Sequence, residues 1–147
     1  MTRVSLDSNV LVYAELEPES DKGKRAHELI AASAPREILA VQTLLEFAAV
    51  VRRRRPDSVE SALKKISIWG SVFETAATTD RVVAEALKMV LLHQFQVWDG
   101  VIWAAARQAG AAILFSEDLH NGFAKDGMRA VDPFSIDATA LQILMGA

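Results

Sequence analysis

Four acidic side chains lie in apolar stretches of the sequence, where charged residues are unexpected. They are Asp7, Glu46, Asp99 and Asp118. Burying an isolated carboxylate is unfavourable unless the group is paired with an opposite charge, hydrogen-bonded or bound to a metal. Because the same feature recurs in four separate stretches, the sequence predicts a shared site that binds a cation.

Asp7 follows residues that are typical of a buried strand. The run Val4–Leu6 predicts a short strand, and Asp7, Ser8 and Asn9 are residue types that end a strand and begin a helix. Ligands of open α/β sheets bind beyond the carboxyl ends of the strands, so Asp7 is expected at a functional position. The structural alternative is that Asp7 only caps the N-terminus of the following helix.

Glu46 is expected in the first turn of a helix that begins at Thr43. The spacing of these two residues also matches a capping box, in which the glutamate side chain accepts a hydrogen bond from the backbone N–H of the cap residue. The sequence therefore leaves two roles open for Glu46, one in a site and one in helix capping.

Asp99 and Asp118 flank the last strongly apolar part of the chain. Asp99 is expected to open a helix over residues 99–108, and Asp118 follows a buried strand predicted over residues 111–115. Glu117 precedes Asp118 directly and could replace it or join it as the fourth acid.

Oxygen ligands of this kind suit Mg²⁺ or Mn²⁺, and four acids are enough for one or two ions. We expect Asp7 and Asp99 to bind the main metal directly, and Glu46 and Asp118 to hold metal-bound waters or a second ion. A water activated by the metal would then be the nucleophile.

Two groups of basic residues are candidates for contact with nucleic-acid phosphates. They are Lys22, Lys24 and Arg25, near the start of a predicted helix, and Arg52 and Arg53, near the end of another. Guanidinium groups bind phosphate with two hydrogen bonds. The alternative is a solvated helix face for the first group and a favourable interaction with the helix dipole for the second.

Aromatic residues and histidines give weaker signals. Trp69, Trp98 and Trp103 are candidates for stacking on bases, but Trp98 and Trp103 are expected in the core. The three histidines do not have the spacing of metal ligands, and only His120, beside Asp118, is a candidate for a role in the site.

The elements that must position these residues alternate along the chain. Strands are expected at residues 4–6, 37–41, 71–76, 111–115 and 128–131, and helices at 10–14, 21–32, from 43, from 57, from 79, at 99–108 and at 137–145. Strands separated by helices imply crossover connections and a mainly parallel central sheet covered on both faces. The predicted fold is an α/β, three-layer α/β/α sandwich.

Composition bounds the class of protein. With 147 residues, 51% of them hydrophobic and 24% charged, the chain fits one globular domain over residues 1–147. The absence of cysteine excludes zinc–thiolate sites and thiol nucleophiles, and a net charge of −3 argues against a general polyanion-coating protein. No membrane span or secretory signal is recognisable, so a cytoplasmic location is expected.

The acidic stretches, taken together, resemble those of PIN-domain nucleases, and more closely the VapC-type toxins of bacterial toxin–antitoxin pairs. The matching motifs are residues 6–11 (LDSNVL), 45–47 (LEF), 98–102 (WDGVI), 115–122 (FSEDLHNG) and 131–134 (VDPF). The resemblance covers nearly the whole chain. Two positions depart from the family pattern, with Asp132 where asparagine is usual and Gly100 where a small residue such as alanine is usual.

The resemblance implies a fold, an activity and partners. Asp7, Glu46, Asp99 and Asp118 match the acidic quartet of the family, and Asn9 and Ser116 match polar residues that support it. The implied activity is Mg²⁺- or Mn²⁺-dependent cleavage of RNA, with a small cognate antitoxin as partner and a homodimer as the usual assembly.

Two other functions fit the same residues. One is a PIN-like module that binds nucleic acid without turnover, although an intact set of four acids argues against it. The other is a DNA-directed nuclease or a phosphodiesterase, because the same acids would serve that chemistry. An assay of metal-dependent RNA cleavage tests the first alternative. A panel of tRNA, mRNA, single-stranded DNA and a chromogenic phosphodiester tests the second.

Overall fold

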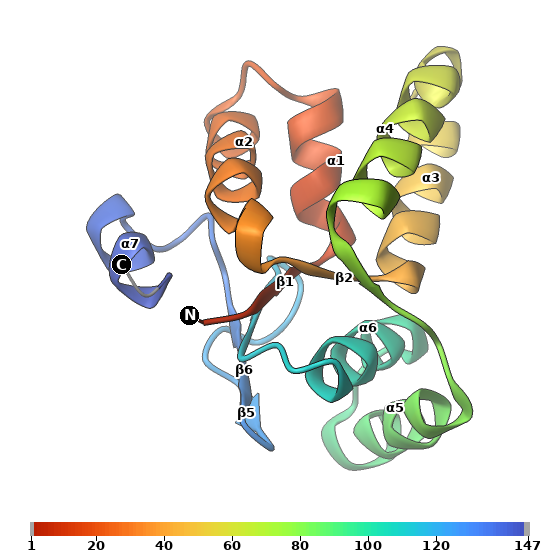
Figure 1. Cartoon of the computed structure of the whole chain (residues 1–147), viewed down its shortest axis with the longest axis vertical. Coiled ribbons are helices and arrows are strands. Elements are labelled where there is room, and N and C mark those ends of the chain that lie inside the picture. Colours follow the sequence, from red (N-terminus) through yellow and green to blue (C-terminus); the bar gives the residue numbers. More distant parts are fainter. Residues whose placement is uncertain (1, 146–147) are drawn as a thin grey trace.

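A mainly parallel sheet lies at the centre of the molecule, between helices on both sides (Figure 1). The computed structural model describes residues 2–145. One sheet has the strand order β1 (Val4–Leu6), β4 (Ile113–Phe115), β6 (Met128–Val131) and β5 (Ala124–Lys125), and a second pairs β2 (Ile38–Ala40) with β3 (Glu74–Ala76). A parallel bridge between Val4 and Glu37 joins the two. Every pairing is parallel except that of β5 with β6.

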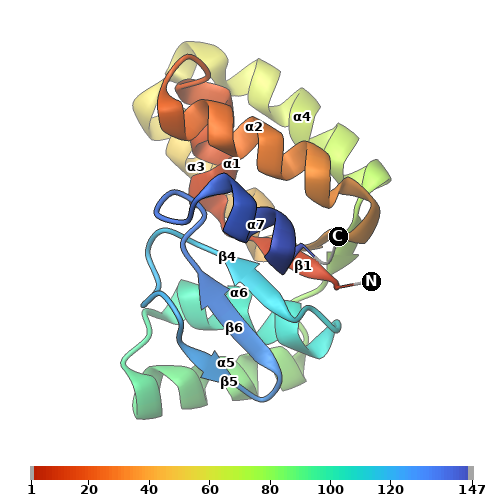
Figure 2. The same cartoon turned by 90° about the vertical axis from the view of Figure 1, so that its left-hand side faces the viewer.

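Helices cover the sheet on two faces. They are α1 (Ser8–Leu16), α2 (Asp21–Ser33), α3 (Val41–Arg54), α4 (Val59–Val72), α5 (Asp80–His93), α6 (Val97–Gln108) and α7 (Ala138–Leu144), with short 3₁₀ turns at Ala34–Arg36 and Pro56–Ser58. The first four lie on one side and α5 with α6 on the other (Figure 1). Figure 2 shows α7 beside α2. The predicted three-layer α/β/α fold is confirmed.

The hydrophobic core is divided by the sheet. Leu6 and Phe47 belong to the cluster beneath α1 to α4, whereas Trp103 and Leu114 belong to the cluster beneath α5 and α6. Strands buried on both faces are expected to be apolar along their whole length, as β4 is. Full burial of such side chains stabilises the fold by about 1.5–3 kcal/mol each. Among residues 2–145, no helix has the length and hydrophobicity needed to cross a membrane.

Several predicted boundaries were wrong. Helix α1 begins at Ser8 rather than at residue 10, and α4 continues to Val72, so the strand expected over 71–76 is only Glu74–Ala76. Strand β5 was not predicted. Trp98, which was expected in the core, is 58% exposed, because it lies on the outer face of the first turn of α6.

The capping-box alternative for Glu46 was also wrong. Helix α3 begins at Val41 and is preceded by Ala40, which makes no side-chain cap. Thr43 is already inside the helix, and its Oγ1 has no hydrogen-bond partner within the part of the chain that the structure describes. Glu46 instead lies in the second turn of α3, and its Oε2 accepts a hydrogen bond from Oγ of Ser8.

The close packing of α5 against α6 explains why glycine occupies position 100, which is one departure from the family pattern. A Cβ atom at this position would lie 2.9 Å from the backbone oxygen of Ala86. Helices α5 and α6 therefore approach so closely that only glycine fits without displacement of the backbone. The departure belongs to helix packing and leaves the neighbouring Asp99 free for the site.

Candidate active site

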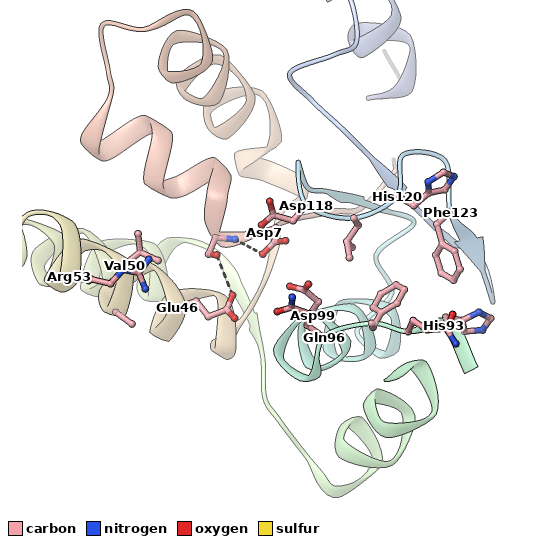
Figure 3. Close-up of a pocket in the computed structure, with 15 residues that line it drawn as sticks. Asp7, Glu46, Val50, Arg53, His93, Gln96, Asp99, Asp118, His120 and Phe123 are labelled. Atoms are coloured by element: carbon pink, nitrogen blue, oxygen red, sulfur yellow. Dashed lines mark hydrogen bonds between the residues drawn. The ribbon is translucent and has the colours of Figure 1, made fainter. Parts of the chain in front are cut away.

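The four acids come from four different elements and meet at one pocket (Figure 3). Asp7 lies between β1 and α1, Glu46 in α3, Asp99 in the first turn of α6, and Asp118 in the loop after β4. This is the edge of the sheet where the parallel strands β1 and β4 end, as expected for an open α/β fold. The pocket has a volume of about 720 Å³.

Asp7 is held in place by two hydrogen bonds. Its Oδ1 accepts one of 2.7 Å from the backbone N–H of Ser8, so the residue does cap α1. Its Oδ2 accepts one of 2.6 Å from Oγ of Ser116. The helix-capping role and a role in the site are therefore compatible, because each uses a different oxygen.

Burial raises the pKa of Asp7 to about 7. The side chain is only 2% exposed. The hydrogen bond from Ser116 lowers the pKa, but the negative charges of Asp99 and Glu46 raise it further. Such an environment disfavours the charged carboxylate unless a cation compensates it.

Glu46 and Asp99 are half-buried and respond to the same charges. Burial is the main cause that raises the pKa of both residues, and the charge of Asp118 raises both further. Ser8 Oγ donates a hydrogen bond of 3.2 Å to Oε2 of Glu46, which lowers the pKa in part. Within residues 2–145 none of the four acids forms an ion pair with a basic residue.

Asn9 and Ser116 connect the loop of Asp118 to the rest of the site. The Nδ2 of Asn9 donates to Oδ2 of Asp118 at 3.3 Å and to Oγ of Ser116 at 3.4 Å. The backbone N–H of Asp118 donates to the same Ser116 Oγ at 3.1 Å. One serine hydroxyl thus links the buried Asp7 with the exposed Asp118.

Glu117 lies away from the pocket. Its carboxylate accepts hydrogen bonds from Nζ of Lys22 and, at 2.7 Å, from Oη of Tyr13. Burial raises the pKa of Glu117, but these bonds outweigh it, and the pKa lies below its ordinary value. Its backbone N–H donates to Oδ1 of Asn9 at 3.3 Å, so it anchors the loop that carries Asp118.

Of the candidate phosphate-binding residues, only Arg53 lines the pocket with the acids. Lys22 is paired with Glu117, and Nη1 of Arg25 donates to the backbone oxygens of Pro133 and Ile136. Lys24 lines a separate depression of about 260 Å³ on α2, together with Lys22 and Arg25. Arg52 is exposed on α3 outside the pocket.

Sequence reasoning missed an aromatic part of the pocket. His93, Phe95, Phe123 and His120 line it beyond Asp99. Only His120 was singled out from the sequence, through its position next to the acids. The others lie in an ordinary helix end and two loops, and no spacing in the sequence joins them.

The donor set fits a hard divalent cation, although the side chains do not form a closed cage. Among the residues from 2 to 145, no three aspartate, glutamate, histidine or cysteine side chains are grouped closely enough to hold an ion. Mg²⁺ commonly takes only one or two carboxylates and keeps several waters. Asp7 is a buried carboxylate without a basic partner, and it lies at a wide pocket lined by further carboxylates. This arrangement matches that mode of binding.

Comparison with known families identifies the class of protein. The model of the PIN domain family matches residues 4–125. The chain therefore belongs to the PIN-domain family. A search of curated proteins gives no match.

Solved structures with the same fold include a toxin and a toxin–antitoxin complex. The VapC20 toxin of Mycobacterium tuberculosis, described as cleaving the Sarcin-Ricin loop, is 16% identical, with a TM-score of 0.67 over 78% of this chain and 89% of that chain. A toxin–antitoxin complex from Klebsiella pneumoniae is 15% identical, with a TM-score of 0.68 over 90% and 99%. A DNA-bound VapBC from Salmonella typhimurium is 17% identical, with a TM-score of 0.66 over 90% and 99%.

Proposed function

We propose that this chain is a metal-dependent endoribonuclease that acts as the toxin of a toxin–antitoxin pair. The observation that carries the proposal is the meeting of Asp7, Glu46, Asp99 and Asp118, from four separate elements, at one pocket. Membership of the PIN-domain family supports nuclease chemistry. The shared fold with a toxin that cleaves the Sarcin-Ricin loop makes RNA the first substrate class to test.

Mg²⁺ or Mn²⁺ would be held by Asp7 and Asp99, with Glu46 and Asp118 around it. Bound there, the cation would offset the charge of the carboxylates and of the phosphodiester in the transition state. Asp7 is suited to direct ligation because Ser116 and Ser8 fix both of its oxygens.

The chain's own side chains have distinct tasks in hydrolysis. Glu46, oriented by Ser8 and with a raised pKa, can accept the proton of an attacking water. Arg53 supplies positive charge to a phosphate that enters a pocket of acids. Asn9 keeps the side chain of Asp118 at the pocket edge.

The direct test is cleavage of single-stranded RNA by the purified chain with Mg²⁺ or Mn²⁺. Asp99→Asn should abolish the activity and leave the circular dichroism spectrum unchanged. Asp132→Asn is the matched control, because Asp132 lies outside the pocket and the change restores the residue usual in the family. Undiminished cleavage by Asp99→Asn would overturn the proposal, and faster cleavage of single-stranded DNA would favour the DNA-directed alternative.

A small cognate antitoxin is the proposed protein partner. Solved structures of the same fold include a toxin–antitoxin complex from Klebsiella pneumoniae. We expect a short reading frame next to this gene to encode a protein that copurifies with the chain and suppresses both RNA cleavage and growth arrest. If its product neither binds nor inhibits, the toxin–antitoxin assignment fails while the nuclease assignment stands.

A homodimer is the proposed assembly, and α5 offers a surface for it. The apolar residues of this helix fall on two sides in the structure. Val82 and Ala86 are buried, whereas Val83, Leu87 and Leu91 are 42%, 55% and 77% exposed. Such a row of exposed apolar side chains is typical of an interface. Leu87→Asp should convert a dimer to a monomer in light scattering, whereas Leu63→Asp on α4 should not.

A further inference from the structure

The pocket differs in chemistry from one end to the other. Figure 3 shows Arg53 and Val50 on one side of the acids and His93, His120 and Phe123 on the opposite side. We call the second side the ring arm, defined by His93, Phe95, Phe123 and His120. No lysine or arginine of residues 2–145 lines the ring arm.

The rings of this arm pack against one another and against the core. Phe123 lies edge to face with His93 and with Trp103, at centroid distances of 5.2 Å in both cases. Phe95 lies 5.3 Å from Phe123 and 5.8 Å from Trp103. Trp103 is fully buried and holds these rings in place from the core side. His93, Phe95 and Phe123 remain partly exposed.

The polar groups around these rings are amides and imidazoles, and none of them is a lysine or an arginine. Gln94, Gln96 and His120 are exposed and line the pocket. Amides and imidazoles can donate to and accept from the edge of a base, and aromatic faces stack on bases of any sequence. A phosphate, in contrast, would find no strong cationic partner in this arm.

We propose that the ring arm holds one unpaired nucleobase of the RNA, next to the phosphate that lies at the four acids. This inference rests on the proposed function, because it takes RNA as the substrate. The neighbouring phosphate on the opposite side meets Arg53, so the strand crosses the pocket with its backbone towards α3 and one base turned into the ring arm. The pocket volume of about 720 Å³ leaves room for a nucleotide beside the acids.

The test uses a series of RNA substrates that each lack one base, at a different position in each. A short fluorescein-labelled single-stranded RNA containing all four bases is compared with versions that carry an abasic ribose at one position each. Binding to the Asp99→Asn protein is measured by fluorescence anisotropy with Mg²⁺ present. We expect one position, beside the bond that the wild type cleaves, to weaken binding by about tenfold, and the other positions to matter much less.

Phe123→Leu in the same background should reduce that position-specific loss to about twofold or less, because leucine keeps the apolar contact with Trp103 and removes the flat ring. His93→Ala should act in the same direction. Phe134→Leu is the matched control, since this half-buried ring lies next to Tyr13 and outside the pocket, and it should keep the tenfold loss.

The outcomes separate the two proposals. If the wild type cleaves the RNA but every abasic position has an equal effect, the base site is overturned and the nuclease stands. The base site is also overturned if the position-specific loss persists in Phe123→Leu. A position-specific loss that Phe123→Leu removes, in a protein that cleaves no RNA, would support the base site and overturn the nuclease.

Discussion

Ser116 Oγ donates a hydrogen bond of 2.6 Å to Oδ2 of Asp7, across 109 positions of sequence. The parallel register of β1 and β4 explains the contact, because Leu6 is paired with Phe115 and the next residue on each strand enters the site. The same hydroxyl accepts from the backbone N–H of Asp118. Ser116 therefore joins a buried and an exposed member of the acidic set.

Ser116→Ala should lower kcat/KM for RNA cleavage by about ten- to a hundredfold, as is typical when a group that orients a metal ligand is lost. The carboxylate of Asp7 would lose its short hydrogen bond, and the loop of Asp118 would lose an anchor. Steady-state kinetics at saturating Mg²⁺ measure the effect. Ser135→Ala, on the exposed loop before α7, is the control and should behave as the wild type.

Removing the charge of Asp7 should change how stability depends on pH. The pKa of Asp7 is raised from 3.8 to about 7, so the folded protein binds this proton more tightly than the unfolded chain does. The stabilising contribution is complete below the ordinary pKa and is lost as pH rises through about 7.

Asp7→Asn should therefore be inactive yet more stable than the wild type at pH 8 without metal. A shift of this size corresponds to about 4 kcal/mol at most. Thermal unfolding with EDTA at pH 5 and pH 8 tests it, and the difference between the two proteins should shrink at the lower pH. Equal pH dependence in both proteins would mean that the carboxyl is not held in the proposed environment.

Divalent metal should raise the melting temperature of the wild type. A cation that binds only the folded state stabilises it by about 2.7 kcal/mol at a hundred times its Kd. Asp7→Asn and Asp99→Asn should show a smaller rise at the same Mg²⁺ concentration, and EDTA should reverse it. A rise that is the same in Asp99→Asn would locate the bound ion somewhere other than at this pocket.

Arg53 and Arg52 offer a neighbouring pair in which only the first lines the pocket. Arg53→Ala should raise KM for RNA by about three- to tenfold and leave kcat nearly unchanged, because a phosphate contact away from the reacting atoms is lost. Arg52→Ala should have a much smaller effect at the same salt concentration. Equal effects would mean that the whole basic run acts as a diffuse surface.

Gly100 and Gly70 test the close approach of α5 and α6. Gly100→Ala should destabilise the protein by about 1–3 kcal/mol, because the new Cβ would lie 2.9 Å from the Ala86 oxygen. Gly70→Ala, in α4 with no atom within 4 Å of the new Cβ, should stabilise it by about 0.5–1 kcal/mol. Urea unfolding of both variants measures the two opposite signs.

Local patterns in the sequence were enough to predict the layers of the fold and to single out four acids that the structure brings to one pocket. Alternating apolar strands and amphipathic helices report which faces are buried, and a carboxylate such as Asp7 at the end of a buried strand is visible as a conflict with that pattern. Some boundaries were wrong because valines such as Val41 and Val72 favour strands locally, whereas tertiary contacts place them in helices α3 and α4.

The sequence by itself determined the fold class and singled out four carboxylates as candidates, because hydrophobic periodicity and a charge in an apolar run are properties of single stretches. Only the tertiary structure decided which side chains share the pocket. In the folded chain, Glu117 is paired with Lys22, and Arg53 rather than Arg52 lines the pocket of the acids. Phe95 and Phe123 pack against each other in the ring arm. Those outcomes depend on strand register and helix packing between distant segments, which no local spacing encodes.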